Sequence, residues 1–121
     1  MNRGRKISGG KYKKQRKKKF FEKGRQTRIV KLDSVKRKKI RARSGKIKTV
    51  LLSCNKANVL DKKTKKSKVV KITNVLETPS NKFLARQNIL LKGAVIQTEA
   101  GKAKITNRPS QEGSVQAILI E

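Results

Sequence analysis

The chain has 121 residues, a length typical of one domain with a tail. Its formal net charge is +28, because it contains 35 Lys and Arg and only seven Asp and Glu. Self-repulsion of this size destabilises a compact chain, so we expect an anionic partner: nucleic acid, a membrane surface or an acidic protein. With no histidine, one cysteine, scattered acidic residues and no phosphate-binding glycine motif, we expect no enzyme activity, cofactor, metal site or small-molecule substrate.

The N-terminal segment carries most of the charge. Residues 1–50 hold 22 Lys and Arg and two acidic residues, whereas residues 51–121 hold 13 and five. We expect no secretory signal and no transmembrane helix, because the N-terminus lacks an apolar region and no stretch approaches about 18 consecutive apolar residues. Too little apolar area can be buried to offset the entropy of ordering, so residues 1–46 are predicted to form an extended arm, disordered when alone.

Within this arm, the stretch SGGKYKKQRKKKFF (residues 8–21) has seven basic residues in fourteen and no acidic residue. A membrane-surface helix needs an apolar face at helical spacing, which its three aromatic residues do not supply, so we favour nucleic acid over a membrane. Gly9 and Gly10 either let the backbone approach a phosphate, bend the chain, or act as a flexible linker. Tyr12, Phe20 and Phe21 either stack on unpaired bases or anchor the arm on the folded domain.

From Ile47 onward, short β-like runs alternate with turn signals. We expect strands in IKTVLLS (47–53), ANVL (57–60), VVKITNVLE (69–77), ILLKG (89–93), the hairpin AVIQTEAGKAKIT (94–106) and SVQAILI (114–120). KFLARQN (82–88) is predicted to make one helical turn, and the remaining segments are predicted loops: DKKTKKSK (61–68), TPSN (78–81) and NRPSQEG (107–113).

This pattern predicts an all-β domain over residues 47–121. About six or seven short strands joined by short loops favour a small antiparallel β-barrel, with a sandwich as the alternative. Cys54 lies in or after a strand, and with no histidine to activate it we expect a buried apolar residue rather than a nucleophile. Because one cysteine cannot form an internal disulfide, we also expect a reducing compartment.

A basic extended arm on a small barrel favours RNA over DNA as the polyanion. The narrow grooves and junctions of a folded RNA admit a thin chain, and the sequence has no heptad pattern and no clear helix-turn-helix. A DNA-compacting architectural protein remains the alternative from another class.

The stretch GRKISGGKYKKQRKKKFFEKGR (4–25) combines Arg5, Ser8, Gly9 and Gly10, a basic run through Lys19, then Glu22 and Gly24. It resembles the signature of the small-subunit ribosomal protein family eight-e of archaea and eukaryotes, which runs a basic residue, Ser or Thr followed by Gly-Gly, a basic run and Glu-x-Gly. The likeness continues in ANVLD (57–61), RQNILLKGAVIQTEAGKAKITNRPSQEG (86–113) and ILIE (118–121), and the short length is similar to that of archaeal members.

The resemblance implies a β-barrel with an extended N-terminal arm, bound to small-subunit ribosomal RNA beside other small-subunit ribosomal proteins in the cytoplasm. We expect the arm (1–46) to thread between RNA helices and the barrel (47–121) to dock as a rigid body. A ribosome-assembly factor on precursor subunits is the alternative within this class. The residues that we expect to bind RNA are Arg3, Arg5, Lys6, Gly9, Gly10, Lys11, Tyr12, Lys13, Lys14, Arg16, Lys17, Lys18, Lys19, Arg25, Arg28, Arg37, Arg41 and Arg43 in the arm, and Arg86, Asn88 and Lys92 on the barrel rim.

Overall fold

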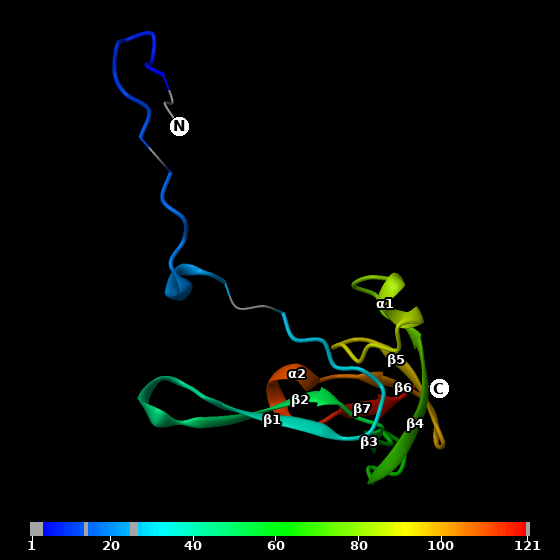
Figure 1. Ribbon diagram of the computed structural model, residues 1–121. Coiled ribbons are helices and arrows are strands. Elements are labelled where there is room, and N and C mark those ends of the chain that lie inside the picture. The colour runs from blue at the N-terminus through cyan, green and yellow to red at the C-terminus, as the bar shows by residue number, and fades with distance from the viewer. Residues whose placement is uncertain (1–3, 14, 25–26, 121) are drawn as a thin grey trace.

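The structure, a computed structural model, describes residues 4–13, 15–24 and 27–120 (Figure 1). Its described part is mostly β-structure, with two α-helical turns and two 3-10 turns. The elements in chain order are η1 (Phe20–Glu22), β1 (Lys36–Arg41), η2 (Arg43–Gly45), β2 (Ile47–Ser53), β3 (Lys56–Leu60), β4 (Ser67–Glu77), α1 (Phe83–Arg86), β5 (Val95–Thr98), β6 (Gly101–Ile105), α2 (Pro109–Glu112) and β7 (Gln116–Leu119). None of the described helices is long and apolar enough to cross a membrane.

Strands β3 to β7 close into a barrel in the order β3-β4-β5-β6-β7. Alternating side chains decide which face of each strand is buried. In β3, Ala57 and Val59 point into the core while Asn58 and Leu60 lie outside, and β5 and β6 alternate in the same way. The predicted barrel is therefore confirmed, although it contains five strands rather than the six or seven expected.

The prediction of a wholly antiparallel barrel was wrong for one pair of strands. β3 and β7 are parallel, with Val59 opposite Ala117 and Leu60 opposite Ile118. The other four pairs of the ring are antiparallel. A closed ring with an odd number of strands cannot alternate direction throughout, so a five-stranded barrel needs one parallel contact.

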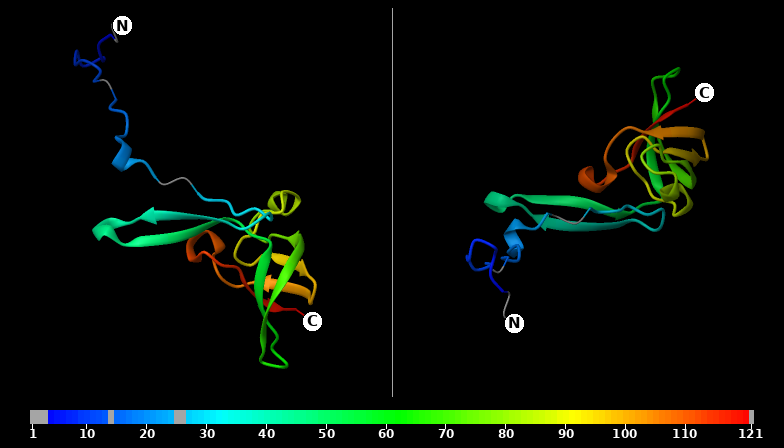
Figure 2. Two further views of the ribbon diagram at one scale, coloured as in Figure 1. Left: turned by 60° about the horizontal axis from the view of Figure 1, so that its bottom comes forward. Right: turned by 90° about the horizontal axis from the view of Figure 1, so that it is seen from above.

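The strand predicted over residues 47–53 has the expected bounds, but it lies outside the barrel. β2 pairs with β1 to form a separate two-stranded ribbon that projects from the barrel (Figures 1 and 2). The expected boundary between residues 46 and 47 falls at the turn that joins these two strands, next to η2. We call residues 36–53 the basic ribbon.

The chain enters the folded core at Val30, upstream of the ribbon, and from here on we call residues 1–29 the arm. The Lys31 N–H donates to Leu52 O at 3.1 Å, and the Cys54 N–H donates to Lys31 O at 3.0 Å. On the other side of this segment, the Leu90 N–H donates to Val30 O at 2.8 Å. Residues 30–32 are thus held between the end of β2 and the segment that follows α1.

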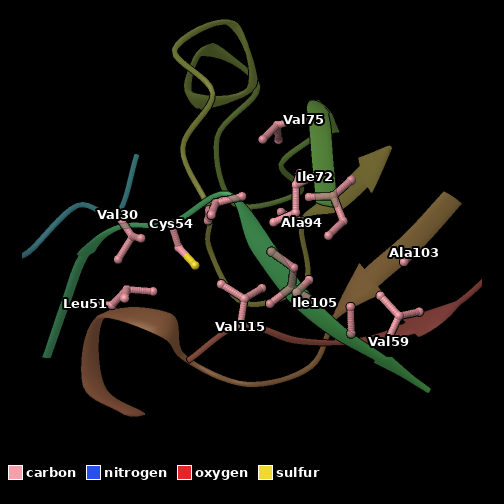
Figure 3. Close-up of a cluster of buried hydrophobic side chains, with 14 residues drawn as sticks. Val30, Leu51, Cys54, Val59, Ile72, Val75, Ala94, Ala103, Ile105 and Val115 are labelled. Carbon is pink, nitrogen blue, oxygen red and sulfur yellow. The ribbon is translucent and has the colours of Figure 1, made fainter. Parts of the chain in front are cut away.

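The core collects apolar side chains from all the barrel strands and from the segments beside them. Figure 3 shows Val30 near Leu51 and Cys54, with Ile72 and Ile105 further along the same cluster. Cys54 is 6% exposed, as predicted from the sequence, and its thiol donates a weak hydrogen bond to Lys56 O at 3.1 Å.

Two predictions for short segments were wrong. ILLKG (89–93) forms no regular strand apart from an isolated bridge at Ile89, although Ile89 and Leu90 are fully buried. NRPSQEG contains the single helical turn α2. Pro109 begins this turn with its φ already suited to a helix, and Gly113 ends it in the left-handed conformation at φ 75°.

Candidate nucleic-acid interface

The two glycines near the N-terminus bend the chain. The Lys6 N–H donates to Gly10 O and the Gly9 N–H donates to Lys6 O, both at 2.8 Å. Gly9 has φ +78°, a conformation that side chains with a Cβ rarely adopt. The resulting loop places Lys6 Nζ 5.8 Å from the centre of the Tyr12 ring, so a cation and an aromatic face lie together on an exposed turn.

A second local structure in the arm surrounds Glu22. Arg16 Nη2 lies 2.7 Å from Glu22 Oε1, and the Lys19 N–H donates to Glu22 Oε2 at 2.9 Å. The Arg16 guanidinium, followed by the Lys19 N–H, holds the pKa of Glu22 below its usual value. Arg16 therefore engages a carboxylate within the arm.

The three aromatic residues of the arm are exposed. Phe20 and Phe21 are 92% and 78% accessible and Tyr12 is 54% accessible, so none of them is buried against the barrel. The arm cations predicted to bind RNA are exposed as well: Arg5, Lys6, Lys11, Lys13, Arg16, Lys17, Lys18 and Lys19. Arg3, Lys14 and Arg25, also predicted to bind RNA, lie outside the described residues.

The basic ribbon presents positive charge on both of its faces. Eight of the thirteen residues from Lys36 to Lys48 are Lys or Arg, and none is acidic. Residues directly opposite each other in an antiparallel pair share a face. Lys39 and Arg41 therefore lie on one face of the exposed half of the ribbon, while Lys38 and Lys48 lie on the other. Arg43 stands at the tip.

The junction between the arm and the barrel contains Arg28. Its side chain is half-buried, and its Nε has no hydrogen-bond partner in the described part of the chain. A buried donor without a partner is unfavourable, so this atom marks an unsatisfied position at the start of the folded core.

The predicted rim residues have different environments. Arg86, at the end of α1, and Lys92 are exposed and free to contact a ligand. Asn88 is half-buried at φ +52°, and its O accepts the Leu32 N–H at 2.9 Å while its Oδ1 lies 3.3 Å from the Val75 N–H. Its carbonyl and amide groups are thus used to hold the loop.

Sequence reasoning missed several exposed residues that belong to these surfaces. Phe83 is 71% accessible and lies one helical turn from Arg86. In the ribbon, only the arginines were predicted to bind RNA, although the density of Lys in the same stretch also indicates an anion-binding surface. The missed cations are Lys36, Lys38, Lys39, Lys46 and Lys48 in the ribbon and Lys62, Lys63, Lys65, Lys66 and Lys68 in the loop between β3 and β4.

Asp61 organises the loop between β3 and β4. Its Oδ1 accepts the Lys63 N–H at 2.9 Å, and its Oδ2 accepts the Thr64 hydroxyl at 2.8 Å. The Asp61 N–H closes the loop by donating to Lys66 O at 3.0 Å. The Thr64 hydroxyl first, and then the Lys63 N–H, lower the pKa of Asp61 below its usual value.

We expect acid to loosen this turn. Because the folded pKa of Asp61 is lowered, its hydrogen bonds stabilise the turn fully above about pH 4 and are lost as the pH falls through the lower, folded value. The Lys63 amide shift, followed by NMR, should report this transition. Asp61→Asn should abolish it, because an amide keeps an acceptor oxygen but does not titrate, and an unchanged titration in this variant would contradict the assignment.

Comparison with known proteins gives consistent matches over nearly the whole chain. Residues 1–120 match the family described as Ribosomal protein S8e. The Small ribosomal subunit protein eS8 of Methanococcus aeolicus is 50% identical over 117 residues, which cover 96% of this chain and 91% of that protein. The proteins of the same name from Sulfurisphaera tokodaii and Methanocorpusculum labreanum are 47% and 45% identical, each covering 97% of this chain and 92% and 94% of its relative.

Proposed function

The chain belongs to the ribosomal protein S8e family, and on that basis we propose that it is a structural constituent of the small ribosomal subunit that binds small-subunit ribosomal RNA. The observation that carries the proposal is the match over residues 1–120 together with a net charge of +28. We propose that it works in the cytoplasm, without a cofactor or a catalytic step, beside other proteins of the subunit.

The arm supplies the electrostatic part of binding. Its exposed lysines act as point charges, while arginines such as Arg5 offer forked donors to phosphate oxygens. Each phosphate neutralised releases condensed counterions, so log K falls by roughly 0.7–0.9 per contact for each unit of log salt. The exposed rings of Tyr12, Phe20 and Phe21 can stack on unpaired bases, which adds a contribution that salt does not screen.

The basic ribbon and the barrel orient the protein on the RNA. The ribbon is anchored to the core by Leu51 and by the hydrogen bonds of Lys31, so its cations project from a rigid base. Arg28 lies where the arm leaves that base, and the accessible part of its half-buried side chain carries positive charge at the junction. We propose that residues 1–28 thread between RNA helices and that Arg37, Arg41 and Arg43 contact phosphates along the ribbon.

Arg86 and Lys92 form the remaining contact on the barrel rim. Both are exposed on either side of the loop held by Asn88, and Phe83 lies on the same helical turn as Arg86. We propose that Asn88 acts mainly by holding this loop in place.

Sedimentation of native lysate through a sucrose gradient, followed by a high-salt wash of the peak fraction, tests the proposal. We expect the protein to remain with mature small subunits at one copy per particle, because a structural constituent is buried among RNA helices. Presence only on precursor particles would indicate an assembly factor instead. Co-migration with DNA would overturn the ribosomal function altogether.

A further inference from the structure

The loop between β3 and β4 is a second basic projection, separate from the ribbon. Residues 61–68, which we call the lysine hairpin, contain five lysines in eight residues, all exposed, and one acidic residue. Both views of Figure 2 show this hairpin and the basic ribbon projecting from different sides of the barrel. The two projections therefore point toward different parts of a binding partner.

Hydrogen bonds within the loop hold the backbone that carries these lysines. Both carboxylate oxygens of Asp61 accept hydrogen bonds from within the loop, so its negative charge lies inside the turn and also attracts Lys63. The loop closes through the bond between the Asp61 N–H and Lys66 O. The lysines are therefore carried by a loop whose one acidic residue is hydrogen-bonded within the loop itself.

The positive surface continues from the hairpin onto the barrel wall. Lys62 and Lys104 line one groove together with Asp61, and its remaining walls include Ile118 and Ile120. Lys104 lies opposite Ile118 in the β6–β7 pair, and Ile118 lies opposite Leu60 at the base of the hairpin. An anionic strand that contacts the hairpin can therefore also reach β6.

We propose that the lysine hairpin binds the phosphate backbone of a second RNA segment, so that the barrel bridges this segment and the one held by the arm and the ribbon. The inference rests on the proposed function and extends it. The hairpin has no arginine or aromatic residue that could read the edge or face of a base. Its lysines act as point charges, which suits contacts with phosphates. Residues 61–68 contain no apolar side chain, so the turn itself lacks the apolar centre of a protein interface.

Hydroxyl-radical footprinting tests this bridging on a transcript of small-subunit ribosomal RNA from Methanococcus aeolicus. The full-length protein is compared with K62Q/K65Q/K66Q in the hairpin and with R37Q/R41Q/R43Q in the ribbon. The matched control K56Q/K71Q/K82Q removes the same charge from exposed barrel positions outside both projections. Circular dichroism verifies that each variant is folded.

We expect two protected RNA segments, of which the hairpin variant loses one and the ribbon variant weakens the other. The control should keep both. The log–log salt slope should fall by about 2 to 3 in the hairpin variant, because three phosphate contacts are lost.

Distinct outcomes separate this inference from the proposed function. If the hairpin variant leaves every protection and the salt slope unchanged while the ribbon variant weakens binding, the bridging inference is overturned and the RNA-binding function stands. Cross-links from the hairpin lysines to an acidic protein instead of RNA in reconstituted subunits would also overturn it. A wild-type protein that protects no RNA would overturn both proposals.

Discussion

Deletion of residues 1–24 is expected to leave a folded barrel whose affinity for small-subunit ribosomal RNA is lower by at least about a hundredfold. The deleted segment holds eleven Lys and Arg and one acidic residue, and its described part supplies no side chain to the core. If every deleted cation contacts a phosphate, the log–log salt slope falls by as much as roughly 8 to 10. Filter binding over a salt series measures both quantities, and circular dichroism measures the fold.

A scrambled arm is the matched control for this deletion. It keeps the length and composition of residues 1–24 but destroys the turn at Gly9 and the pairing of Arg16 with Glu22. We expect it to restore most of the salt slope and only part of the affinity, because charge is regained without the geometry. Unchanged affinity and slope in the deletion would show that the arm does not bind RNA.

Val30→Ala is expected to lower the free energy of unfolding by about 2 kcal/mol, because two buried methyl groups are lost and a cavity remains. Val30 is fully buried in the core and follows directly after the arm. For a domain of this size, such a loss is a large fraction of the total stability. Urea unfolding at elevated salt, which screens the repulsion between cations, measures the change.

The neighbouring residue supplies the control. Ile29 is also a large β-branched residue, but 47% of its surface is exposed, so Ile29→Ala should change the unfolding free energy by less than about 0.5 kcal/mol. Equal, small effects of the two substitutions would show that this segment is not packed on the barrel. A loss confined to Val30→Ala would place the start of the folded domain upstream of the ribbon.

The second hairpin of the barrel was predictable because its signals are local. Residues 95–98 and 101–105 alternate between buried and exposed side chains, and Gly101 supplies a positive φ of +120° at the turn. β3, β4, β7 and the helical turn α1 were predicted to within two or three residues for the same reason. Each of these elements carries its own pattern of apolar residues or its own turn residues.

The strand β1 was not predictable from its own residues. KRKKIR contains five cations and one apolar residue, so it shows neither alternation nor enough hydrophobicity for a strand. It is a strand because β2 offers it a partner, and β2 in turn is held at its far end by Leu51 in the core. The same nonlocal pairing explains why β2 had the expected bounds but lies outside the barrel.

The candidate interface was likewise predictable only in part. The density of Lys and Arg indicated a polyanion-binding chain and marked the arm, because charge is a property of composition. It could not indicate that Asn88 holds a loop, since the residues it bonds, Leu32 and Val75, are distant in sequence.

The sequence by itself determined the charge, the family and the short alternating strands, because each of these can be read from adjacent residues. Only the tertiary structure decided that the barrel closes with five strands and one parallel pair, and that Val30 joins its core. It also decided that the basic ribbon and the lysine hairpin project from different sides. These features depend on which distant segments pair and pack, and a pattern along one segment does not identify its partner.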